Sequence, residues 1–369
     1  MQVPFLDLKA NYLPIKEEIN TAIQEVLDNT AYILGSKVTQ FEKAFADAHH
    51  VKHCLGLSSG TDGNHLASVV LGIQPNDEII MPANTFIATA WGATLCGAKP
   101  VFVDCDKESY TIDIQQVEAA ITPRTKAIVA VHLYGQPANL DPLKTIAQKH
   151  KIALIEDAAQ AHLAQYKGKP VGGIGDVAAF SFYPGKNLGA YGEAGALTTQ
   201  SDHLADLAKK YREHGQSAKY YHETLGHNYR MEAIQGAVLG VKMKYLQQFT
   251  EKRRAIAQQY YQQLSGIEQL ILPKEMPYAQ HVYHLFVVQT VQRDALQQFL
   301  TEKGIGTGLH YPVPLHLQQC FKNLGYQAGN FPISEQLGKQ CLSLPMFPEM
   351  TNEQVVYVCE QISRFFSQQ

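Results

Sequence analysis

The sequence lacks the patterns that would place this protein in a membrane or on nucleic acid. In 369 residues no run approaches about eighteen consecutive apolar residues, so no transmembrane helix is expected. The formal net charge is only −3, which gives no electrostatic reason to expect nucleic acid or an anionic membrane as a partner. The N-terminus has no basic region followed by an apolar one, which argues against a secretory signal.

Cysteine is scarce and carries no metal-binding pattern. The six cysteines form no C-x-x-C pair, and no cysteine–histidine spacing suits zinc, so no metal site is expected. Most stand among apolar residues, and we predict reduced, buried thiols in a cytoplasmic protein. The composition, 45% hydrophobic and 18% charged, is that of a globular chain long enough for one large domain and a smaller one.

Short apolar runs alternate with amphipathic segments in the first half of the chain. Strands are expected at 77–82, 99–104, 126–135 and 151–157, and helices at 85–96, 114–121 and 141–150. Strands that are apolar on both faces and alternate with helices indicate a buried, mostly parallel sheet in an α/β domain. Ligands of such sheets bind beyond the carboxyl ends of the strands.

The pattern changes after Gly226. A long helical tract is expected at 231–264, followed by a strand at 283–290 and a helix at 293–304. Thr351 and Gln354 have the spacing of a capping box, which predicts a final helix. We therefore predict a large domain at 1–245 and a smaller α+β domain at 246–369.

Two segments place polar groups where an α/β sheet meets its ligands. Asp157 ends the apolar run 151–157, where its carboxylate could hold a positive charge; the alternative is a helix cap. The sequence SSGTDGNHLASVVLG (58–72) places a Ser-Gly-Thr turn before an apolar helix. The N–H groups and dipole of such a helix start suit a phosphate, although a plain capped helix has the same pattern.

A third segment, FSFYPGKNLGAYGEAGAL (180–197), contains Lys186 as its only lysine or arginine. An amine among glycine, aromatic and small residues can be stripped of water, which lowers its pKa and makes it a nucleophile suited to a Schiff base. The alternative is a lysine whose head reaches solvent past an apolar stem. In a fourth segment, Asn228 and Arg230 precede the helical tract, a position that an ordinary capping turn would also explain.

Taken in order, these segments resemble the pyridoxal 5'-phosphate (PLP) enzymes of the aspartate-aminotransferase fold, PLP fold type I. Within that fold the chain is similar to the DegT/DnrJ/EryC1/StrS family of nucleotide-sugar aminotransferases. The similarity runs almost end to end and rests on the motifs PFLDLK, YILG, SSGTDG, MPANTFIATA, GAKPVFVDCD, VHLYGQPANLDPL, IEDAAQAH, FSFYPGKNLGAYGEAGAL, HNYRMEAIQGA and GLHYPVPLHLQ.

The resemblance implies a cofactor site. Lys186 would form the covalent aldimine with PLP and later move the proton between the substrate carbon and the cofactor. Asp157 would contact the pyridine nitrogen and keep it protonated. The other implied contacts are backbone N–H groups of Gly60 and Thr61 and the hydroxyl of Ser181 to the phosphate, Gln160 to the phenolate oxygen, and the ring of Phe86 stacked on the cofactor.

The resemblance also implies a shared active site. The asparagine that matches Asn228 reaches the phosphate of the neighbouring subunit in this family, so a homodimer is expected. Tyr183, His310 and Tyr311 are candidates for the wall of the sugar pocket.

Two positions depart from the family pattern. Gly63 and Asn64 follow SGTD, where the family usually has alanine and then leucine or a similar residue. Leu163 follows EDAAQAH, where glycine is usual. We expect these changes to reshape the pocket without touching a group that must do chemistry.

The implied reaction passes an amino group from L-glutamate to a keto sugar carried on a nucleoside diphosphate. PFLDLK and YILG favour C3 of a dTDP-linked 3-keto-6-deoxyhexose; amination at C4, and UDP or GDP as the nucleotide, stay open. A dehydratase of this fold would have histidine in place of Lys186. A non-catalytic PLP-fold scaffold or regulatory protein would be expected to have lost Lys186 or Asp157.

Overall fold

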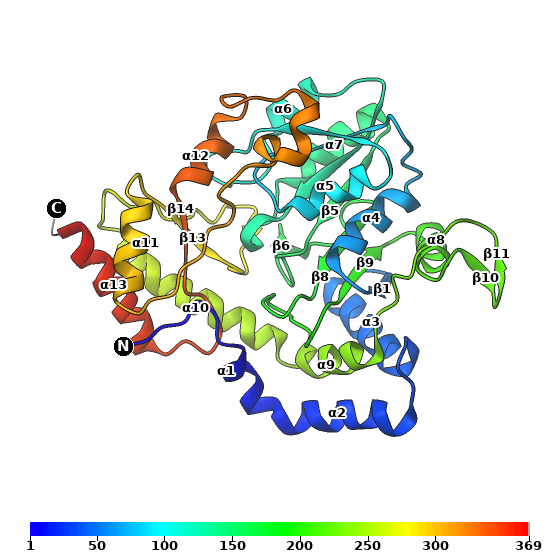
Figure 1. The fold of residues 1–369 in the computed structure, drawn as a ribbon, viewed down its shortest axis with the longest axis horizontal. Coiled ribbons are helices and arrows are strands. Elements are labelled where there is room, and N and C mark those ends of the chain that lie inside the picture. The colour runs from blue at the N-terminus through cyan, green and yellow to red at the C-terminus, as the bar shows by residue number, and fades with distance from the viewer. Residues whose placement is uncertain (368–369) are drawn as a thin grey trace.

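The computed structural model describes residues 1–367 and is built around a seven-stranded sheet with the order β1-β9-β8-β5-β4-β2-β3 (Figure 1). Strands β2, β3, β4, β5 and β8 run parallel, and β9 lies antiparallel to its neighbours β1 and β8. The predicted α/β fold with a mostly parallel sheet is therefore confirmed. The strands are β1 His53–Leu57, β2 Glu78–Pro82, β3 Lys99–Val103, β4 Thr125–Val131, β5 Ala153–Asp157, β8 Val177–Ser181 and β9 Gly195–Thr199.

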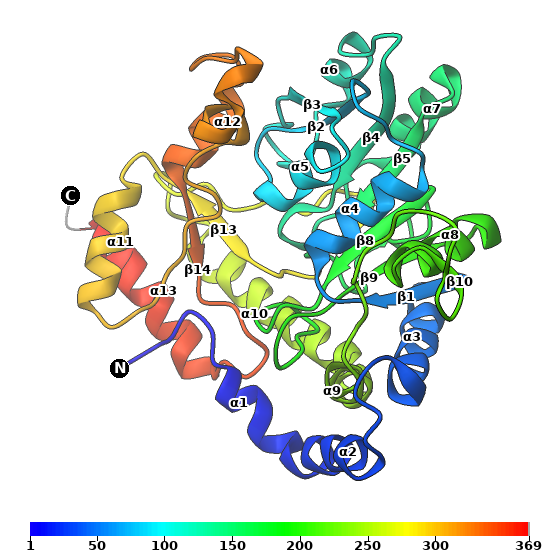
Figure 2. The same cartoon turned by 45° about the vertical axis from the view of Figure 1, so that its right-hand side comes forward.

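Helices cover both faces of this sheet (Figures 1 and 2). One apolar cluster joins α3, α7 and α9 to the sheet, and a second joins α4, α5 and α8 to the opposite face. In β5, Leu154 belongs to the first cluster and Ile155 to the second, because neighbouring side chains of a strand point to opposite faces. The helices are α2 Lys16–Asn29, α3 Gly35–His49, α4 Gly60–Val70, α5 Ile87–Thr94, α6 Ile114–Ala119, α7 Leu140–His150, α8 Asp202–Arg212 and α9 Ala233–Met243.

The C-terminal part forms a smaller lobe, seen on the left of Figures 1 and 2. Its own apolar cluster runs from Ile256 to Phe366 and also contains Val3, whose backbone pairs with Ile305. Other residues between 285 and 341 pack against the large lobe, so the domain boundary at 245 stays a prediction. The elements are α10 Leu246–Leu264, β13 Phe286–Gln289, α11 Arg293–Glu302, α12 Pro332–Gln340, β14 Cys341–Leu344 and α13 Asn352–Ser367.

Short elements complete the described chain. These are α1 Leu8–Tyr12, β6 Gln165–Tyr166, β7 Lys169–Pro170, β10 Gln216–Ala218, β11 Tyr221–His222, β12 Ala279–Gln280, and the 3-10 turns η1 Leu13–Ile15, η2 Leu133–Gly135, η3 Leu315–Leu317 and η4 Gln319–Leu324.

One predicted strand is clearly shorter in the structure, and one predicted helical tract is interrupted. The strand expected at 126–135 stops at Val131, because the chain turns through Tyr134 with φ 60° and its N–H donates to Gln160 Oε1 at 2.6 Å. The helical tract expected at 231–264 is two helices, α9 and α10, broken after Met243. Lys244 Nζ and the Tyr245 hydroxyl both donate to Glu18 of α2, and these bonds fix the chain between α9 and α10.

The predicted capping box at the start of α13 is confirmed, since the N–H of Gln354 donates to Thr351 Oγ1 and the N–H of Thr351 to Gln354 Oε1. All six cysteines have free thiols; Cys320 is exposed and Cys96 half-buried, so the expectation of buried thiols holds only for the other four. Within residues 1–367 no helix is both long and apolar enough to cross a membrane. The same residues contain no group of three acidic, histidine or cysteine side chains able to hold a metal ion.

Asp104, just after β3, fastens the small lobe to the sheet. Its buried carboxylate accepts hydrogen bonds from the N–H groups of Ile333 at 2.9 Å and Ser334 at 2.8 Å, and from the Ser334 hydroxyl at 2.6 Å. These donors form the first turn of α12, where a negative charge is favourable. Asp104 therefore fixes α12 and the loops before it against the large lobe.

Replacing Asp104 with alanine should lower the free energy of unfolding by about 3 kcal/mol, because buried donors then lose a charged acceptor. Urea denaturation of the cofactor-free protein measures the change. Asp7→Ala is the matched control: the Asp7 carboxylate caps α1 by accepting one bond from the N–H of Ala10, and its loss should cost about 1 kcal/mol. Equal losses in the two variants would contradict the anchoring role of Asp104.

Candidate active site

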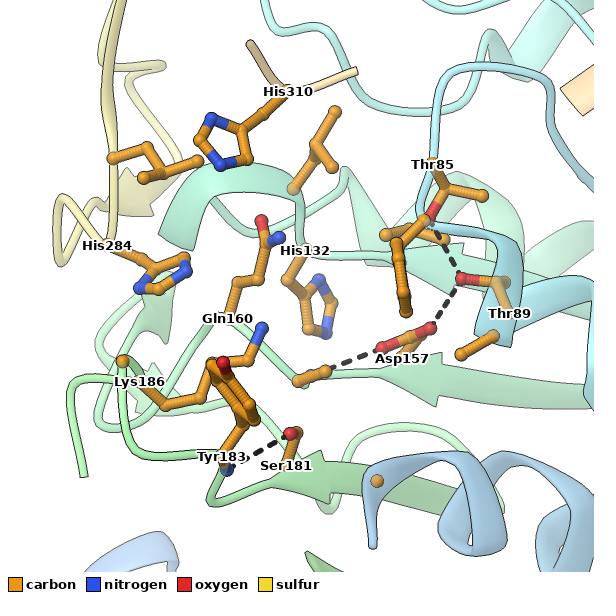
Figure 3. A pocket seen from close by; sticks show the side chains of 18 of the residues that line it. Thr85, Thr89, His132, Asp157, Gln160, Ser181, Tyr183, Lys186, His284 and His310 are labelled. Atoms are coloured by element: carbon orange, nitrogen blue, oxygen red, sulfur yellow. Dashed lines mark hydrogen bonds between the residues drawn. The ribbon is translucent and has the colours of Figure 1, made fainter. Parts of the chain in front are cut away.

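A cavity of about 560 Å³ lies beyond the carboxyl ends of β1, β2, β4, β5 and β8 (Figure 3). Its wall combines strand ends and helix starts of the large lobe with residues of the small lobe and of the N-terminal segment. The volume is in the range of small-molecule sites. The structure brings to this wall every site residue named from the sequence except Asn228: Gly60, Thr61, Phe86, Asp157, Gln160, Tyr183, Ser181, Lys186, His310 and Tyr311.

The start of α4 presents backbone N–H groups to one end of the cavity. Ser59 caps the helix by accepting from the N–H of Asp62 at 3.1 Å, and the N–H groups of Gly60 and Thr61 have no partner within the helix. A Cβ on Gly60 would lie 2.5 Å from Cβ of Ser181. Only glycine therefore lets this helix start reach the Ser181 hydroxyl, and together they form a seat for an anion.

Asp157 ends β5 with its buried carboxylate on the cavity wall. Its Oδ2 accepts from Asn64 Nδ2 at 3.0 Å and from Thr89 Oγ1 at 2.6 Å, and its Oδ1 accepts from the N–H of Ala159 at 3.2 Å. The carboxylate therefore has a fixed orientation. The expectation that Asn64 touches no chemically important group is wrong, since Asn64 holds this carboxylate.

Lys186 follows β8 on a turn closed by its N–H and the carbonyl of Tyr183 at 2.8 Å. Figure 3 shows its side chain extending into the cavity, with Asp157 on the other side. Burial lowers the pKa of Lys186 to about 8, and the attraction of Asp157 offsets part of this effect. At pH 7 about one amine in ten is then neutral, compared with roughly one in three thousand for an unperturbed lysine.

His310 and His284, two histidines close to Lys186, are neutral at pH 7. Burial and the nearby Lys186 lower the pKa of His310 to about 4 and that of His284 well below its usual value. His132 accepts the N–H of Ala138 at Nδ1, so its Nε2 carries the proton that it donates to buried Glu156 at 3.0 Å. Among the described residues of the wall, Lys186 is the only lysine or arginine.

Aromatic rings and the amide of Gln160 form another part of the wall. Phe86 and Tyr311 lie with ring centroids 5.5 Å apart, and Phe86 is 51% exposed although it opens a helix beside the cavity. Gln160 accepts the N–H of Tyr134, so its Nε2 is the end that donates to the Tyr311 hydroxyl at 3.0 Å. His310 contacts Ser343 Oγ through Nδ1 at 2.8 Å.

Asn228 lies away from the cavity of its own chain and is exposed. Its backbone is held by a bridge to Glu213, and the ring of Tyr229 stacks on that of His227 at 4.7 Å. Asn228 is therefore exposed to solvent on a segment whose backbone is fixed by pairing with Glu213.

The sequence reasoning missed several residues of the wall, chiefly Asn64, Thr85, Thr89, His132, His284, Phe5 and Leu6. Thr85 comes shortly after the strand expected at 77–82, so the rule that ligands bind beyond strand ends could have found it. His132 lies inside the strand expected at 126–135, and only the observed end of β4 at Val131 places it at the sheet edge. His284 lies inside a segment expected as a strand. Phe5 and Leu6 carry no local signal, because only the folded chain brings the N-terminus to the cavity.

Leu163, the second departure from the family pattern, has φ 62°, a conformation that glycine adopts freely. A leucine there costs about 1–2 kcal/mol of backbone strain. Its side chain packs against the apolar cluster on one face of the sheet, which offsets part of that cost. The glycine that is usual at this position of the motif therefore suits the positive φ, whereas this chain adopts the same φ with a leucine at a cost in backbone strain.

The residues of the wall fit PLP. At Gly60, any side chain would occupy the space beside Ser181 that a phosphate needs. The carboxylate of Asp157 suits a protonated ring nitrogen, and Lys186 is the amine that can bond covalently to an aldehyde. Phe86 offers a flat apolar face. The donor set and the volume together suit a phosphorylated pyridine.

Comparisons with known proteins match the chain to one family over nearly its whole length. A profile described as the DegT/DnrJ/EryC1/StrS aminotransferase family matches residues 14–363. A pleiotropic regulatory protein of Geobacillus stearothermophilus is 45% identical over 99% of this chain and 99% of its own length. The dTDP-3-amino-3,4,6-trideoxy-alpha-D-glucose transaminase of Streptomyces venezuelae is 42% identical, covering 98% of this chain and 95% of the relative. A UDP-N-acetyl-3-dehydro-alpha-D-glucosamine 3-aminotransferase of Acidithiobacillus ferrooxidans is also 42% identical, covering 98% and 97%.

Solved structures match over nearly the whole chain. The structure of S. venezuelae DesV in complex with a ketimine intermediate superposes with a TM-score of 0.97 at 42% identity, covering 99% of this chain and 98% of that one. The Bacillus subtilis NtdA structure with bound cofactor PMP has a TM-score of 0.92 at 32% identity, covering 99% and 85%. A sugar aminotransferase of Streptococcus pneumoniae in its PLP form has a TM-score of 0.90 at 25% identity, covering 95% and 96%.

Proposed function

The chain belongs to the DegT/DnrJ/EryC1/StrS aminotransferase family, and on that premise we propose that it transfers an amino group from L-glutamate to C3 of a dTDP-linked 3-keto-6-deoxyhexose. It is a PLP-dependent aminotransferase, and its relatives include transaminases of nucleotide-linked 3-amino sugars. One observation carries the proposal: Lys186 and Asp157 enter one cavity from opposite sides, in a wall that fits PLP.

PLP, when bound, supplies an electron sink that takes up the electron pair left when a proton leaves the substrate carbon. Lys186 would hold the cofactor through Nζ. The same amine would accept the proton that leaves the substrate carbon and return it to the cofactor side. Because burial lowers the pKa of this amine to about 8, both its neutral and charged forms are populated near neutral pH, as proton transfer in both directions requires.

The other wall residues orient the cofactor. Asp157 faces the ring nitrogen, and Gln160 has a second amide hydrogen free to reach the phenolate oxygen while it donates to Tyr311. Gly60, Thr61 and the Ser181 hydroxyl would hold the phosphate. Phe86 would cover one face of the ring and exclude water from it.

Aromatic and imidazole side chains are the candidates for the sugar side of the cavity. Tyr183, 54% exposed, and the pair His310 and Tyr311 lie at this side, and His310 is uncharged at pH 7. The 3-amino sugars in the names of relatives support C3 over C4.

A partner subunit completes the site in this proposal. The carboxylates of glutamate and the diphosphate of the nucleotide favour positively charged donors, and Lys186 is the only lysine or arginine on the described wall of one subunit. Beside Asn228, the β10–β11 hairpin projects from the body in Figure 1 and leaves Tyr220, Tyr221 and Leu225 exposed, Leu225 at 92%. Covering these side chains by a second copy would bring Asn228 of the partner subunit to the phosphate.

Asn228→Ala should weaken cofactor retention about tenfold, because one hydrogen bond to a charged phosphate is lost, and should leave the monomer folded. Equilibrium dialysis measures the affinity for PLP, and circular dichroism checks the fold. Asn323→Ala, an exposed asparagine on the small lobe, is the matched control and should retain PLP normally. A variant with unchanged dimerisation and unchanged cofactor affinity would remove the shared site.

The decisive experiment supplies pure enzyme and PLP with L-glutamate and, in parallel, 3-keto and 4-keto dTDP-6-deoxysugars. The C3 proposal predicts product only from the 3-keto sugar, identified by mass and NMR. Product only from the 4-keto sugar would support the C4 alternative.

The 45% identity to a pleiotropic regulatory protein makes a regulatory role the second candidate function. The presence of Lys186 and Asp157 argues against a non-catalytic regulator, and Lys186 argues against a dehydratase. A colourless protein that does not respond to glutamate would support the regulatory alternative.

A further inference from the structure

The carboxylate of Asp157 is held from behind by two side chains of neighbouring helices. Asn64 of α4 donates from Nδ2 at 3.0 Å and Thr89 of α5 donates from Oγ1 at 2.6 Å, both to Oδ2. All three side chains are buried, so water does not compete for these bonds. The family pattern gave no reason to expect this arrangement, since leucine or a similar residue is usual at the position of Asn64.

The directions of these hydrogen bonds follow from the groups involved. An amide NH₂ only donates, and Thr89 has a single hydroxyl proton, which points to the carboxylate. Thr85 Oγ1, 2.8 Å from Thr89 Oγ1, must therefore donate to Thr89. Oδ2 of Asp157 thus faces donors only and cannot carry a proton without losing one of the bonds. Oδ1, which accepts only the longer bond from Ala159 N, is the oxygen left for the cavity.

Two glycines allow the helices to come this close. A Cβ on Gly63 would lie 3.1 Å from the carbonyl oxygen of Ala196 and 3.2 Å from Cβ of Ala179, so glycine lets α4 settle on β8 and β9. A Cβ on Gly92 would lie 2.7 Å from the carbonyl oxygen of Asn64, so glycine also lets α5 approach α4. Gly63 and Asn64, the two adjacent departures from the family pattern, therefore act together. Gly63 lets α4 lie close to β8 and β9, and at this short distance Asn64 reaches the carboxylate of Asp157.

We propose that Asn64 is a positioning residue that, with Thr89, occupies Oδ2 of Asp157 and leaves Oδ1 alone to meet the ring nitrogen of PLP. Any proton shared by the carboxylate and the cofactor then lies on the line between Oδ1 and that nitrogen. The inference concerns the cofactor site and does not depend on which sugar the enzyme uses.

The test replaces Asn64 with leucine, which has a similar size and no donor, and Thr89 with valine. With PLP labelled with ¹⁵N in its ring, the nitrogen resonance of the bound cofactor should have the protonated position in the wild type and move toward the unprotonated position in both variants. The single-turnover rate with glutamate should fall about tenfold, the effect of one bond to a charged group, while the glutamate concentration for half-maximal rate changes less than about twofold.

Controls on the same helices separate positioning from packing. Ser68→Ala in α4 and Thr94→Val in α5 remove hydroxyls that bond only to backbone carbonyls, and both should keep the wild-type nitrogen resonance. In an Asp157→Asn background, Asn64→Leu should cause no further loss of rate, because it acts through Asp157.

An unchanged nitrogen resonance in both Asn64→Leu and Thr89→Val would overturn the inference, as would a full additional loss of rate in the Asp157→Asn background. If Asn64→Leu fails to fold, Thr89→Val decides the question. A wild type that does not react with glutamate would count against the proposed donor alone, since the nitrogen resonance is read without any substrate.

Discussion

Replacing Lys186 with alanine should leave a folded protein that binds PLP without a covalent bond and forms product at least about a thousandfold more slowly. Two functions are lost with one group: the nucleophile that bonds to the cofactor and the base that moves the proton. No other wall residue can replace it. The histidines beside it are held neutral with pKa values below 6.5, and no second lysine or arginine lies on the described wall.

Absorbance and product analysis check this expectation. The covalently bound cofactor makes the wild type yellow, and glutamate should bleach it; Lys186→Ala should show the spectrum of the free aldehyde and no response. Lys242→Met is the matched control, because Lys242 is a second buried lysine whose pKa burial lowers to about 8, yet its amine donates to the carbonyl of Gly189 outside the cavity. Wild-type turnover in Lys186→Ala would refute the central role of this amine.

Asp157→Asn should lower the turnover number by about a thousandfold while weakening PLP binding no more than about tenfold. The reason is partly charge, since a neutral amide cannot hold the ring nitrogen protonated. Geometry adds to it. Asn64 and Thr89 both donate toward the position of Oδ2, so the new side chain must place its oxygen there. Its NH₂ group then faces the cavity and offers a donor where the ring nitrogen needs an acceptor.

Steady-state kinetics and PLP titration separate the two effects in Asp157→Asn. Asp176→Asn is the control: Asp176 is an exposed carboxylate whose bond to the N–H of Leu154 supports the same strand, β5, away from the cavity. It should leave both the turnover number and the PLP affinity within about threefold of wild type. If Asp157→Asn loses affinity and turnover equally, the carboxylate serves only to bind the cofactor.

Local patterns predicted the framework because the parallel strands, buried on both faces, are nearly continuous apolar runs. The same patterns failed where a distant contact decides the backbone. The strand at 126–135 ends early because Tyr134 turns to meet Gln160, and the tract at 231–264 breaks where Glu18 binds its middle. Neither partner is near in sequence, so no periodicity could reveal it.

In the active site, too, some residues could be predicted from local sequence and others could not. Asp157 and Ser181 end strands and Lys186 follows one, and their place at the sheet edge could be predicted from the sequence. The role of Asn64 could not, because it depends on how closely α4 lies against the sheet, which Gly63 and Gly92 determine together. Asn228 is a further case: its proposed target is on another copy of the chain, which one sequence cannot display.

The cavity wall joins segments that lie far apart in the sequence. Phe5 and Leu6 line it together with Met346, and two backbone hydrogen bonds hold Val3 between Gly304 and Gly306. A fragment that contains Lys186 and the whole large sheet but lacks residues 285–346 would therefore leave the amine beside an incomplete wall, and cofactor binding should require both lobes together.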